Sequence, residues 1–212
     1  MKKIRLFSLP LAVLLTIGLM PAREAAGQLG ASVGVNYSKL SDINLGSGST
    51  RFQDASGWHA EVWFDMNVGP LSMRPGLRYV QAGSVFEFAN DANTSFRDNF
   101  NVNMFEVPLD FRFRFNMEIA TPYVAVGPVL RFPSAARGSV SGMKSMNVAG
   151  GFGVGLEMNL GAVLLYPELK FTFGITPFTE QTFEIENIAF TTDDNQQLNG
   201  VMLRLGIGFK QR

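Results

Sequence analysis

The chain has no cysteine among its 212 residues, so neither disulfide bonds nor thiolate metal sites can hold its fold together. It has a single histidine, and its 18 basic residues equal its 18 acidic residues in number. Without a basic excess, neither nucleic acid nor an anionic membrane surface is indicated as a partner. After Met20 the chain also lacks any apolar run of the roughly 20 residues that a membrane-spanning helix needs. These absences exclude a helical membrane protein and a disulfide-bonded exported domain.

The N-terminal segment has the three parts of a secretory signal peptide. A positive start with Lys2, Lys3 and Arg5 precedes an apolar run from Leu6 to Met20, and a stretch of small residues follows. Because the apolar run is shorter than a spanning helix, a cleaved leader is favoured over an anchor. We expect residues 1–27 to be the cleaved signal peptide and residues 28–212 to form one exported domain. The leader holds four of the 18 basic and one of the 18 acidic residues, which leaves 14 basic and 17 acidic groups and a net charge of −3.

Phenylalanine and glycine are abundant, with 19 and 22 residues, and this composition indicates strands rather than helices. From Phe105 to Phe115 every second residue is apolar, and acidic residues, arginines and a proline stand between. A period of two places the two sets on opposite faces of a strand. A soluble sheet would bury the apolar face, whereas a membrane barrel turns that face toward lipid and encloses the charges.

The same alternation recurs in eight segments of about ten residues, the length that a tilted transmembrane strand requires. These segments are residues 29–37, 58–67, 71 to beyond 79, 105–115, 123–132, 147–158, 163–173 and 201–209. Short connections alternate with long polar ones, as in an up-and-down barrel with four external loops and periplasmic termini. The sequence therefore predicts an all-β fold, an eight-stranded antiparallel up-and-down transmembrane β-barrel in the bacterial outer membrane.

The polar face of the predicted strands carries six acids and six bases. The predicted lumen charge network consists of Glu61, Asp65, Arg74, Arg78, Glu106, Asp110, Arg112, Arg114, Glu157, Glu168, Lys170 and Arg204. Buried charges must be paired, and eight strands enclose just enough width for side chains to fill. Gly151, Gly153 and Gly155 on the same face would leave room for long side chains opposite. We therefore expect a packed ionic core and not a conduit.

Three features complicate the alternation. The segment 123–132 is apolar on both faces, but Arg131 favours an arrangement with Val126 and Leu130, together with Val124 and Phe132, on the outside. Strict alternation also points Trp63 into the lumen. Prolines inside strands remove a ladder donor and predict bulges. The prolines concerned are Pro75, Pro108, Pro128 and Pro167.

Aromatic residues lie near the ends of several predicted strands on the apolar face. This position is typical of the two girdles at the lipid interfaces of a membrane barrel. The predicted girdle residues are Tyr37, Trp58, Phe115, Phe173 and Phe209. Outer-membrane lipid and lipopolysaccharide are the partners that such a surface implies.

Four short motifs resemble the small outer-membrane barrels of the PorT family, and the plan is similar to that of OmpA- and OmpX-type barrels. The motifs are Arg78-Tyr79-Val80-Gln81-Ala82-Gly83, Phe105-Glu106-Val107-Pro108-Leu109, Val126-Gly127-Pro128 and Pro167-Glu168-Leu169-Lys170-Phe171. The resemblance implies a barrel in the outer membrane and, from the namesake, a part in secretion or assembly. It brings no catalytic motif.

Few residues are candidates for catalysis or for binding a metal ion or nucleotide. His59 has Ser56 and Glu61 close by in sequence, which leaves a lipid-modifying enzyme as an alternative, but we expect His59 to pair with a lumen carboxylate. The segment with Asp193, Asp194 and Asn195 is acidic, as are Glu180, Glu184 and Glu186, yet it lacks the spacing of a calcium loop. The glycines from Gly151 to Gly155 precede no helix, so they predict no nucleotide site.

We therefore expect no enzyme activity, no cofactor and no metal. The predicted protein is a monomeric barrel with a closed lumen and a structural, adhesion, ligand-binding or assembly role, with any ligand bound at the external loops. Two other classes remain open, a soluble lipocalin-like carrier, which would also have eight strands, and a diffusion pore.

Overall fold

The computed structural model describes residues 27–44, 49–68, 71–86, 88–90, 95–96, 102–115, 117, 120–135, 140–185, 188–191 and 196–209. The predicted signal peptide lies outside these residues, apart from Gly27. Among the described residues, no helix has the length and apolar character to cross a membrane.

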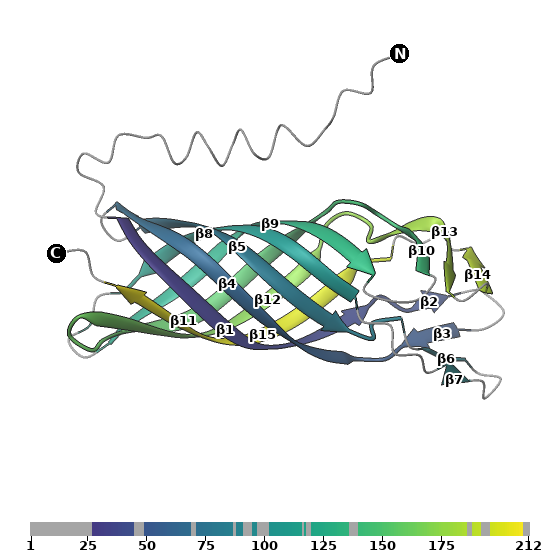
Figure 1. Cartoon of the computed structure of the whole chain (residues 1–212), viewed down its shortest axis with the longest axis horizontal. Coiled ribbons are helices and arrows are strands. Elements are labelled where there is room, and N and C mark those ends of the chain that lie inside the picture. The colour runs from purple at the N-terminus through teal and green to yellow at the C-terminus, as the bar shows by residue number, and fades with distance from the viewer. Residues whose placement is uncertain are drawn as a thin grey trace, which may run out of the picture.

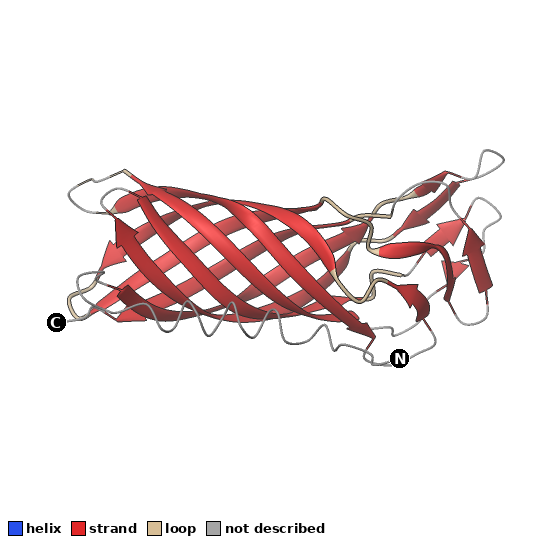
Figure 2. Cartoon of the chain, turned by 90° about the horizontal axis from the view of Figure 1, so that it is seen from above, coloured by secondary structure: helices blue, strands red, loops and turns tan. Residues whose placement is uncertain are grey.

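Eight long strands form a closed antiparallel barrel (Figures 1 and 2). They are β1 (Gly27–Leu40), β4 (Ala55–Val68), β5 (Leu71–Gly83), β8 (Val102–Arg114), β9 (Thr121–Ala135), β11 (Asn147–Asn159), β12 (Val163–Gly174) and β15 (Leu198–Phe209). Each strand pairs with its neighbour in sequence, and β1 closes the barrel by pairing with β15 as well as with β4. The predicted fold class is confirmed.

The barrel strands are longer than the sequence pattern suggests, at 12 to 15 residues each. Most of the additional residues lie at the end where the long connections begin. For example, β1 continues to Leu40 and β8 starts at Val102. The barrel therefore extends beyond the roughly ten residues per strand that a bilayer requires.

The described parts of the long connections contain seven short strands, which the sequence pattern does not predict. Four of them form one sheet: β2 (Ile43–Asn44), β3 (Ser49–Phe52), β6 (Phe88–Asn90) and β7 (Ser95–Phe96). Three form a second sheet: β10 (Val140–Met143), β13 (Thr179–Ile185) and β14 (Ile188–Thr191). We call these seven strands and the described residues that connect them to the barrel the loop cap; Figure 1 shows it at the right-hand end of the barrel.

The structure confirms the predicted facing of the side chains of β9 and of Trp63. In β9, Tyr123, Ala125 and Arg131 are buried in the lumen, while Val126 and Leu130 are exposed on the outside. Trp63 on β4 is also inside and only 2% exposed.

The predicted bulges at the four prolines are wrong. Pairing keeps the same register on both sides of Pro75, where Pro75 faces Leu109 and Arg78 faces Glu106. Pro128 faces Gly150 and Pro167 faces Leu205 within regular ladders, and the register of Pro108 with Val129 also continues unchanged. The described irregularities lie elsewhere, between Gln81 and Gly83 and between Ser141 and Met143. A proline removes only its own donor, and directly opposed ion pairs near two of them, Arg78 with Glu106 and Glu168 with Arg204, support the register.

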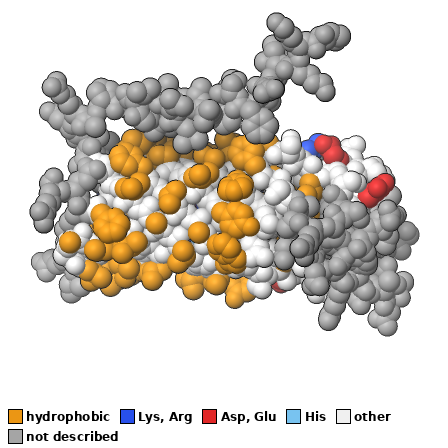
Figure 3. Space-filling view, viewed as in Figure 1, with side chains coloured by type: hydrophobic (Ala, Val, Ile, Leu, Met, Phe, Trp, Pro, Cys, Tyr) orange, Lys and Arg blue, Asp and Glu red, His pale blue; other side chains and the backbone are white. Residues whose placement is uncertain are grey.

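The outside of the barrel is apolar over its whole wall. Figure 3 shows hydrophobic side chains across the barrel, whereas the visible described charges lie toward the loop cap. All five predicted girdle residues, Tyr37, Trp58, Phe115, Phe173 and Phe209, are exposed on this surface. Trp58, Tyr79 and Phe105 form a row of touching rings with centroids 5.3 and 5.5 Å apart. Such a surface contradicts the soluble carrier, which would have charges outside and apolar residues within.

Candidate functional site: a filled lumen beneath a loop cap

Charged side chains from six strands fill the middle of the lumen. We call this group the central ion layer; it contains Glu61, Arg78, Glu106, Asp110, Arg131, Glu168, Lys170 and Arg204. All eight are nearly inaccessible to solvent. Four acids face four bases, so the layer is neutral.

The ion pairs of this layer run across the barrel. Glu106 lies 2.6 Å from Arg78 and 2.9 Å from Arg131, and Arg78 continues to Glu61 at 3.3 Å. Arg204 pairs with Glu61 and lies 2.6 Å from Glu168 on the opposite side. The Nζ atom of Lys170 donates to both carboxylate oxygens of Asp110, at 2.6 and 2.5 Å. Because β4, β5, β8, β9, β12 and β15 all contribute, the network crosslinks most of the wall.

A second charged group lies near the ends of the strands that are joined by short turns. We call it the floor cluster; it contains Asp65, Arg74, Arg112, Arg114 and Glu157. The Oδ2 atom of Asp65 accepts hydrogen bonds from all three arginines, at 2.7 Å from Arg74 and 3.1 Å from Arg114. Arg114 also lies 3.1 Å from Glu157.

Three aromatic rings cover the faces of two guanidinium groups in the floor cluster. The guanidinium of Arg74 lies 3.6 Å from the ring centroid of Trp63, and that of Arg112 lies 3.8 Å from the ring centroid of Tyr123. Tyr166 contacts both arginines, at 4.6 and 5.1 Å. Cation–π contact stabilises a desolvated guanidinium, and the rings also fill this end of the lumen.

All twelve predicted lumen charges take part in ion pairs in these two groups. The structure adds a seventh base, Arg131, which the predicted network omitted although its position in the lumen was expected. The signal was available, because Arg131 shares its face of β9 with Tyr123 and Ala125. The glycines of β11 lie beside these charges: a Cβ atom on Gly151 would lie 3.0 Å from the Lys170 side chain, and one on Gly153 would lie 2.9 Å from that of Glu168.

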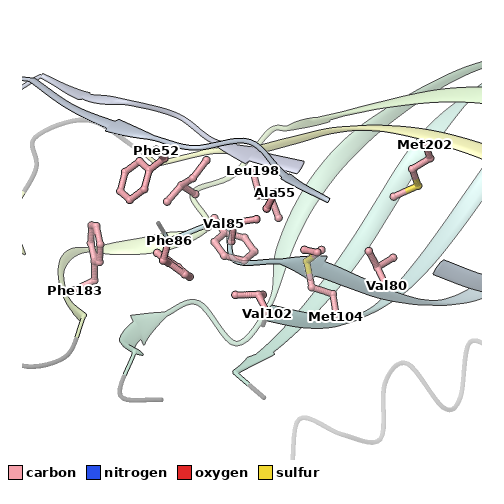
Figure 4. Close-up of a cluster of buried hydrophobic side chains, with 13 residues drawn as sticks. Phe52, Ala55, Val80, Val85, Phe86, Val102, Met104, Phe183, Leu198 and Met202 are labelled. Atoms are coloured by element: carbon pink, nitrogen blue, oxygen red, sulfur yellow. The ribbon is translucent and has the colours of Figure 1, made fainter. Parts of the chain in front are cut away.

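The loop end of the lumen is closed by hydrophobic side chains (Figure 4). We call this cluster the apolar plug; it contains Leu40, Phe52, Ala55, Val80, Ala82, Val85, Phe86, Val102, Met104, Phe178, Phe183, Leu198 and Met202. Phe86 is fully buried and its ring centroid lies 6.2 to 6.4 Å from those of Phe52, Phe178 and Phe183. Barrel strands and loop cap therefore share one hydrophobic core.

Hydrogen bonds fasten the loop cap to the barrel. The backbone N–H groups of Ile175 and Thr176 in the cap donate to the carbonyl of Val148 on β11 at 2.9 and 3.0 Å, and the N–H of Val148 donates to Oγ1 of Thr176 at 2.7 Å. From below, Arg131 donates to the backbone carbonyl of Leu198 at 2.7 Å. The central ion layer, the apolar plug and the cap are thus one connected structure.

The structure does not bring together a serine–histidine pair. His59 is fully buried in the lumen, whereas Ser56 is exposed. Neither ring nitrogen of His59 has a hydrogen-bond partner among the described residues, so the expected pairing with a lumen carboxylate is wrong. Glu61 bonds Arg78 and Arg204 instead, because guanidinium groups reach it from the facing strands.

The acidic segment between β12 and β15 is only partly described. Glu180 pairs with Lys144, and Glu184 is exposed on β13. Glu186, Asp193, Asp194 and Asn195 lie outside the described residues. Within the described part of the chain, no group of three or more metal-binding side chains is arranged to hold a metal ion.

An antiparallel eight-stranded barrel with an apolar wall and enclosed charges defines the class of outer-membrane β-barrel proteins. The chain belongs to the family described as outer membrane protein beta-barrel domain, which it matches over residues 24–180. It is accordingly a protein of the bacterial outer membrane. No curated protein matches the sequence.

The chain is similar to solved structures of other outer-membrane proteins. The chain is similar to Neisserial surface protein A (NspA), with a TM-score of 0.56 and 12% identity over 86% of this chain and 97% of that chain. It is also similar to Ail, the attachment invasion locus protein of Yersinia pestis, with a TM-score of 0.43 and 12% identity over 86% and 99% of the two chains. A third similarity is to the outer membrane protease OmpT from Escherichia coli, with a TM-score of 0.43 and 7% identity over 87% and 97%.

Proposed function

We propose that this protein is a non-conducting outer-membrane barrel whose folded loop cap binds a partner outside the cell. The observation that carries the proposal is the apolar plug, because it gives the external loops a fixed shape through a core shared with the barrel. Loops held on a rigid scaffold are the usual carriers of binding sites. The predicted outer-membrane lipid and lipopolysaccharide would surround the wall, and the barrel would act as a monomer.

The filled lumen supports a role other than diffusion. The central ion layer and the floor cluster occupy the lumen with paired charges, and the apolar plug covers its outer end. A hydrated solute would have to separate ion pairs and displace hydrophobic side chains in order to pass. The barrel therefore serves as an anchor and support for the cap.

We also infer that the protein is not a lipid-modifying hydrolase of the serine–histidine type. Such an enzyme needs its serine within hydrogen-bond reach of the imidazole, and here the two side chains lie on opposite sides of the wall. Expression of the protein should leave the mass spectrum of lipid A unchanged. A mass change that disappears in a His59→Ala variant would contradict this inference.

The resemblance to the PorT family would add a secretion or assembly role. In the structure the charged residues of those motifs, Arg78, Glu106, Glu168 and Lys170, are all members of the central ion layer. The motifs therefore support a lumen packed in the same way as in the PorT family more than they support the same biological role. We favour the binding role.

The proposal is tested with arrays of glycans and extracellular proteins. Detergent-purified full-length protein, labelled with a fluorophore, should bind a discrete set of array positions. A Phe86→Ala variant, which removes the ring at the centre of the apolar plug, should lose that set while its barrel stays folded. As the matched control, Phe173→Ala removes an outward-facing ring from the barrel wall and should bind as the parent does. The proposal fails if the parent binds nothing or if both variants bind alike.

A further inference from the structure

The floor cluster carries an excess of positive charge. It sets the three guanidinium groups of Arg74, Arg112 and Arg114 against the two carboxylates of Asp65 and Glu157, which leaves one positive charge. The central ion layer, by contrast, has four charges of each sign. A buried charge without compensation is strongly unfavourable, so the floor cluster is the place in the lumen where a negative charge is missing.

The same region contains hydrogen-bond donors that have no partner among the described residues. They are Nε of Arg74, Nε of Arg112, Nε2 of Gln28 and the hydroxyl group of Ser72, whereas Nη2 of Arg112 lies 3.8 Å from Glu157. Arg74, Arg112 and Ser72 are 0 to 1% exposed. Buried donors in folded proteins almost always find an acceptor, so this concentration of free donors also indicates a missing ligand.

These hydrogen-bond donors lie close to one another in the lumen. Arg74 and Arg112 bond the same oxygen of Asp65, and both contact the ring of Tyr166. The hydroxyl group of Tyr166 donates to Gln28 at 2.7 Å. Ser72 stands directly opposite Arg112 in the pairing of β5 with β8, and both side chains are in the lumen.

We propose that the floor cluster binds one small monovalent anion, such as chloride, from the periplasmic side. The single positive excess matches one negative charge, and the groups here that have neither a hydrogen-bond nor an ion-pair partner among the described residues are donors apart from Oδ1 of Asp65. Trp63 and Tyr123 cover guanidinium faces, so the anion meets the N–H edges. Arg114 and Glu157 are 10% and 20% exposed and mark the side from which the anion enters. This site goes beyond the proposed function and does not depend on the loop cap.

Thermal unfolding in a nonionic detergent tests the site, with sodium chloride compared against sodium gluconate at equal ionic strength. A ligand that binds only the folded protein stabilises it in proportion to the logarithm of its concentration. We expect the unfolding temperature to rise by several degrees with chloride, and bromide to act in the same way. Gluconate is much larger than chloride, and we expect it not to enter the site. Strongly hydrated anions generally stabilise folded proteins. Stabilisation by chloride and not by gluconate would therefore run against this general salt effect.

Two serine substitutions make the test specific. Ser72→Asp supplies a carboxylate opposite Arg112, so this variant should unfold at a higher temperature in gluconate and should no longer respond to chloride. Ser32→Asp makes the same change at another buried serine without a partner, but it faces Glu61 in the neutral layer. This control should be less stable than the parent and should keep its chloride response.

A third variant keeps the test decisive if Ser72→Asp does not fold. Arg112→Gln removes the positive excess together with one of the free donors, and should also abolish the chloride response. The site is disproved if chloride and gluconate act alike on the parent, or if the folded Ser72→Asp and Arg112→Gln variants respond to chloride as the parent does.

Discussion

The charged residues in the lumen of this barrel are paired, and their facing follows from the sequence alone. A period of two assigns Glu106, Asp110 and Arg112 to one side of β8, and the structure places all three in the lumen. Their partners do not follow from the sequence. Glu168 stands directly opposite Arg204 in the pairing of β12 with β15, and Glu61 meets Arg204 from β4, two strands away on the other side of β15. Only the register of the closed barrel determines which side chains meet.

His59 is a second residue whose facing, but not whose partners, could be predicted from the sequence. Its inward facing could be predicted, but a carboxylate partner could not, since arginines compete for every acid near it. Guanidinium groups form two parallel hydrogen bonds with a carboxylate and stay charged, so they outcompete a neutral imidazole.

At the residue scale, we predict that Glu106→Gln destabilises the barrel strongly. The change leaves Arg78 and Arg131 without the charge that they share, and breaking a buried ion pair costs about 3–5 kcal/mol. Urea unfolding from lipid vesicles, followed by tryptophan fluorescence, measures the loss. Glu180→Gln is the matched control, since its pair with Lys144 is exposed and should contribute at most about 1 kcal/mol. Equal effects of the two substitutions would contradict the assignment.

At the scale of elements, the eight long strands were predictable because each has a sustained alternation of apolar and polar residues. The short strands of the loop cap were not, because two to seven residues are too few to show a period. Phe52 stands alone in a polar segment, and the apolar pieces around Phe86 and Phe183 are too short to predict a core. They become a core only because the barrel brings the ends of four connections together.

The contact between β8 and β9 gives a second prediction. A Cβ atom at Gly127 would overlap the backbone carbonyl of Leu109 on the next strand, which has no room to yield. Gly127→Ala should therefore lower the free energy of unfolding by about 1–3 kcal/mol, the usual cost of overpacking. In the control Gly151→Ala, the first group met is the flexible end of Lys170 at 3.0 Å, so its loss should be smaller. Chemical unfolding measures the free energy of unfolding of both variants. A larger loss of stability for Gly151→Ala than for Gly127→Ala would contradict the close approach of Gly127 to the backbone of Leu109.

The loop cap gives a third prediction, which concerns folding of the cap separately from the barrel. Phe86→Ala leaves a cavity among three other phenylalanine rings, and such truncations cost about 3–5 kcal/mol. We expect limited proteolysis in vesicles to cut the external connections faster, while the barrel strands stay protected. Fragments produced at the parental rate would show that the apolar plug does not hold the cap.

At the scale of the whole molecule, the lumen has three levels: an aromatic and cationic floor, a neutral ion layer and an apolar plug beneath the cap. The sequence predicted a charged interior but not this division. Trp63, Tyr123 and Tyr166 come from three strands and lie together only in the closed barrel. The class of protein followed from alternation, strand length and loop lengths, since these are local properties, whereas the closure of the lumen depends on contacts between distant strands.

The central claim is that this lumen is filled and closed, and electrical recording in planar lipid bilayers tests it most directly. The purified full-length protein is inserted, its folding is verified by heat-dependent mobility in gels, and a general porin serves as the positive control. We predict no steady current above the bare bilayer, because ions would have to cross both charged groups and the apolar plug. Steady, stepwise currents of porin size from the inserted protein would contradict the account.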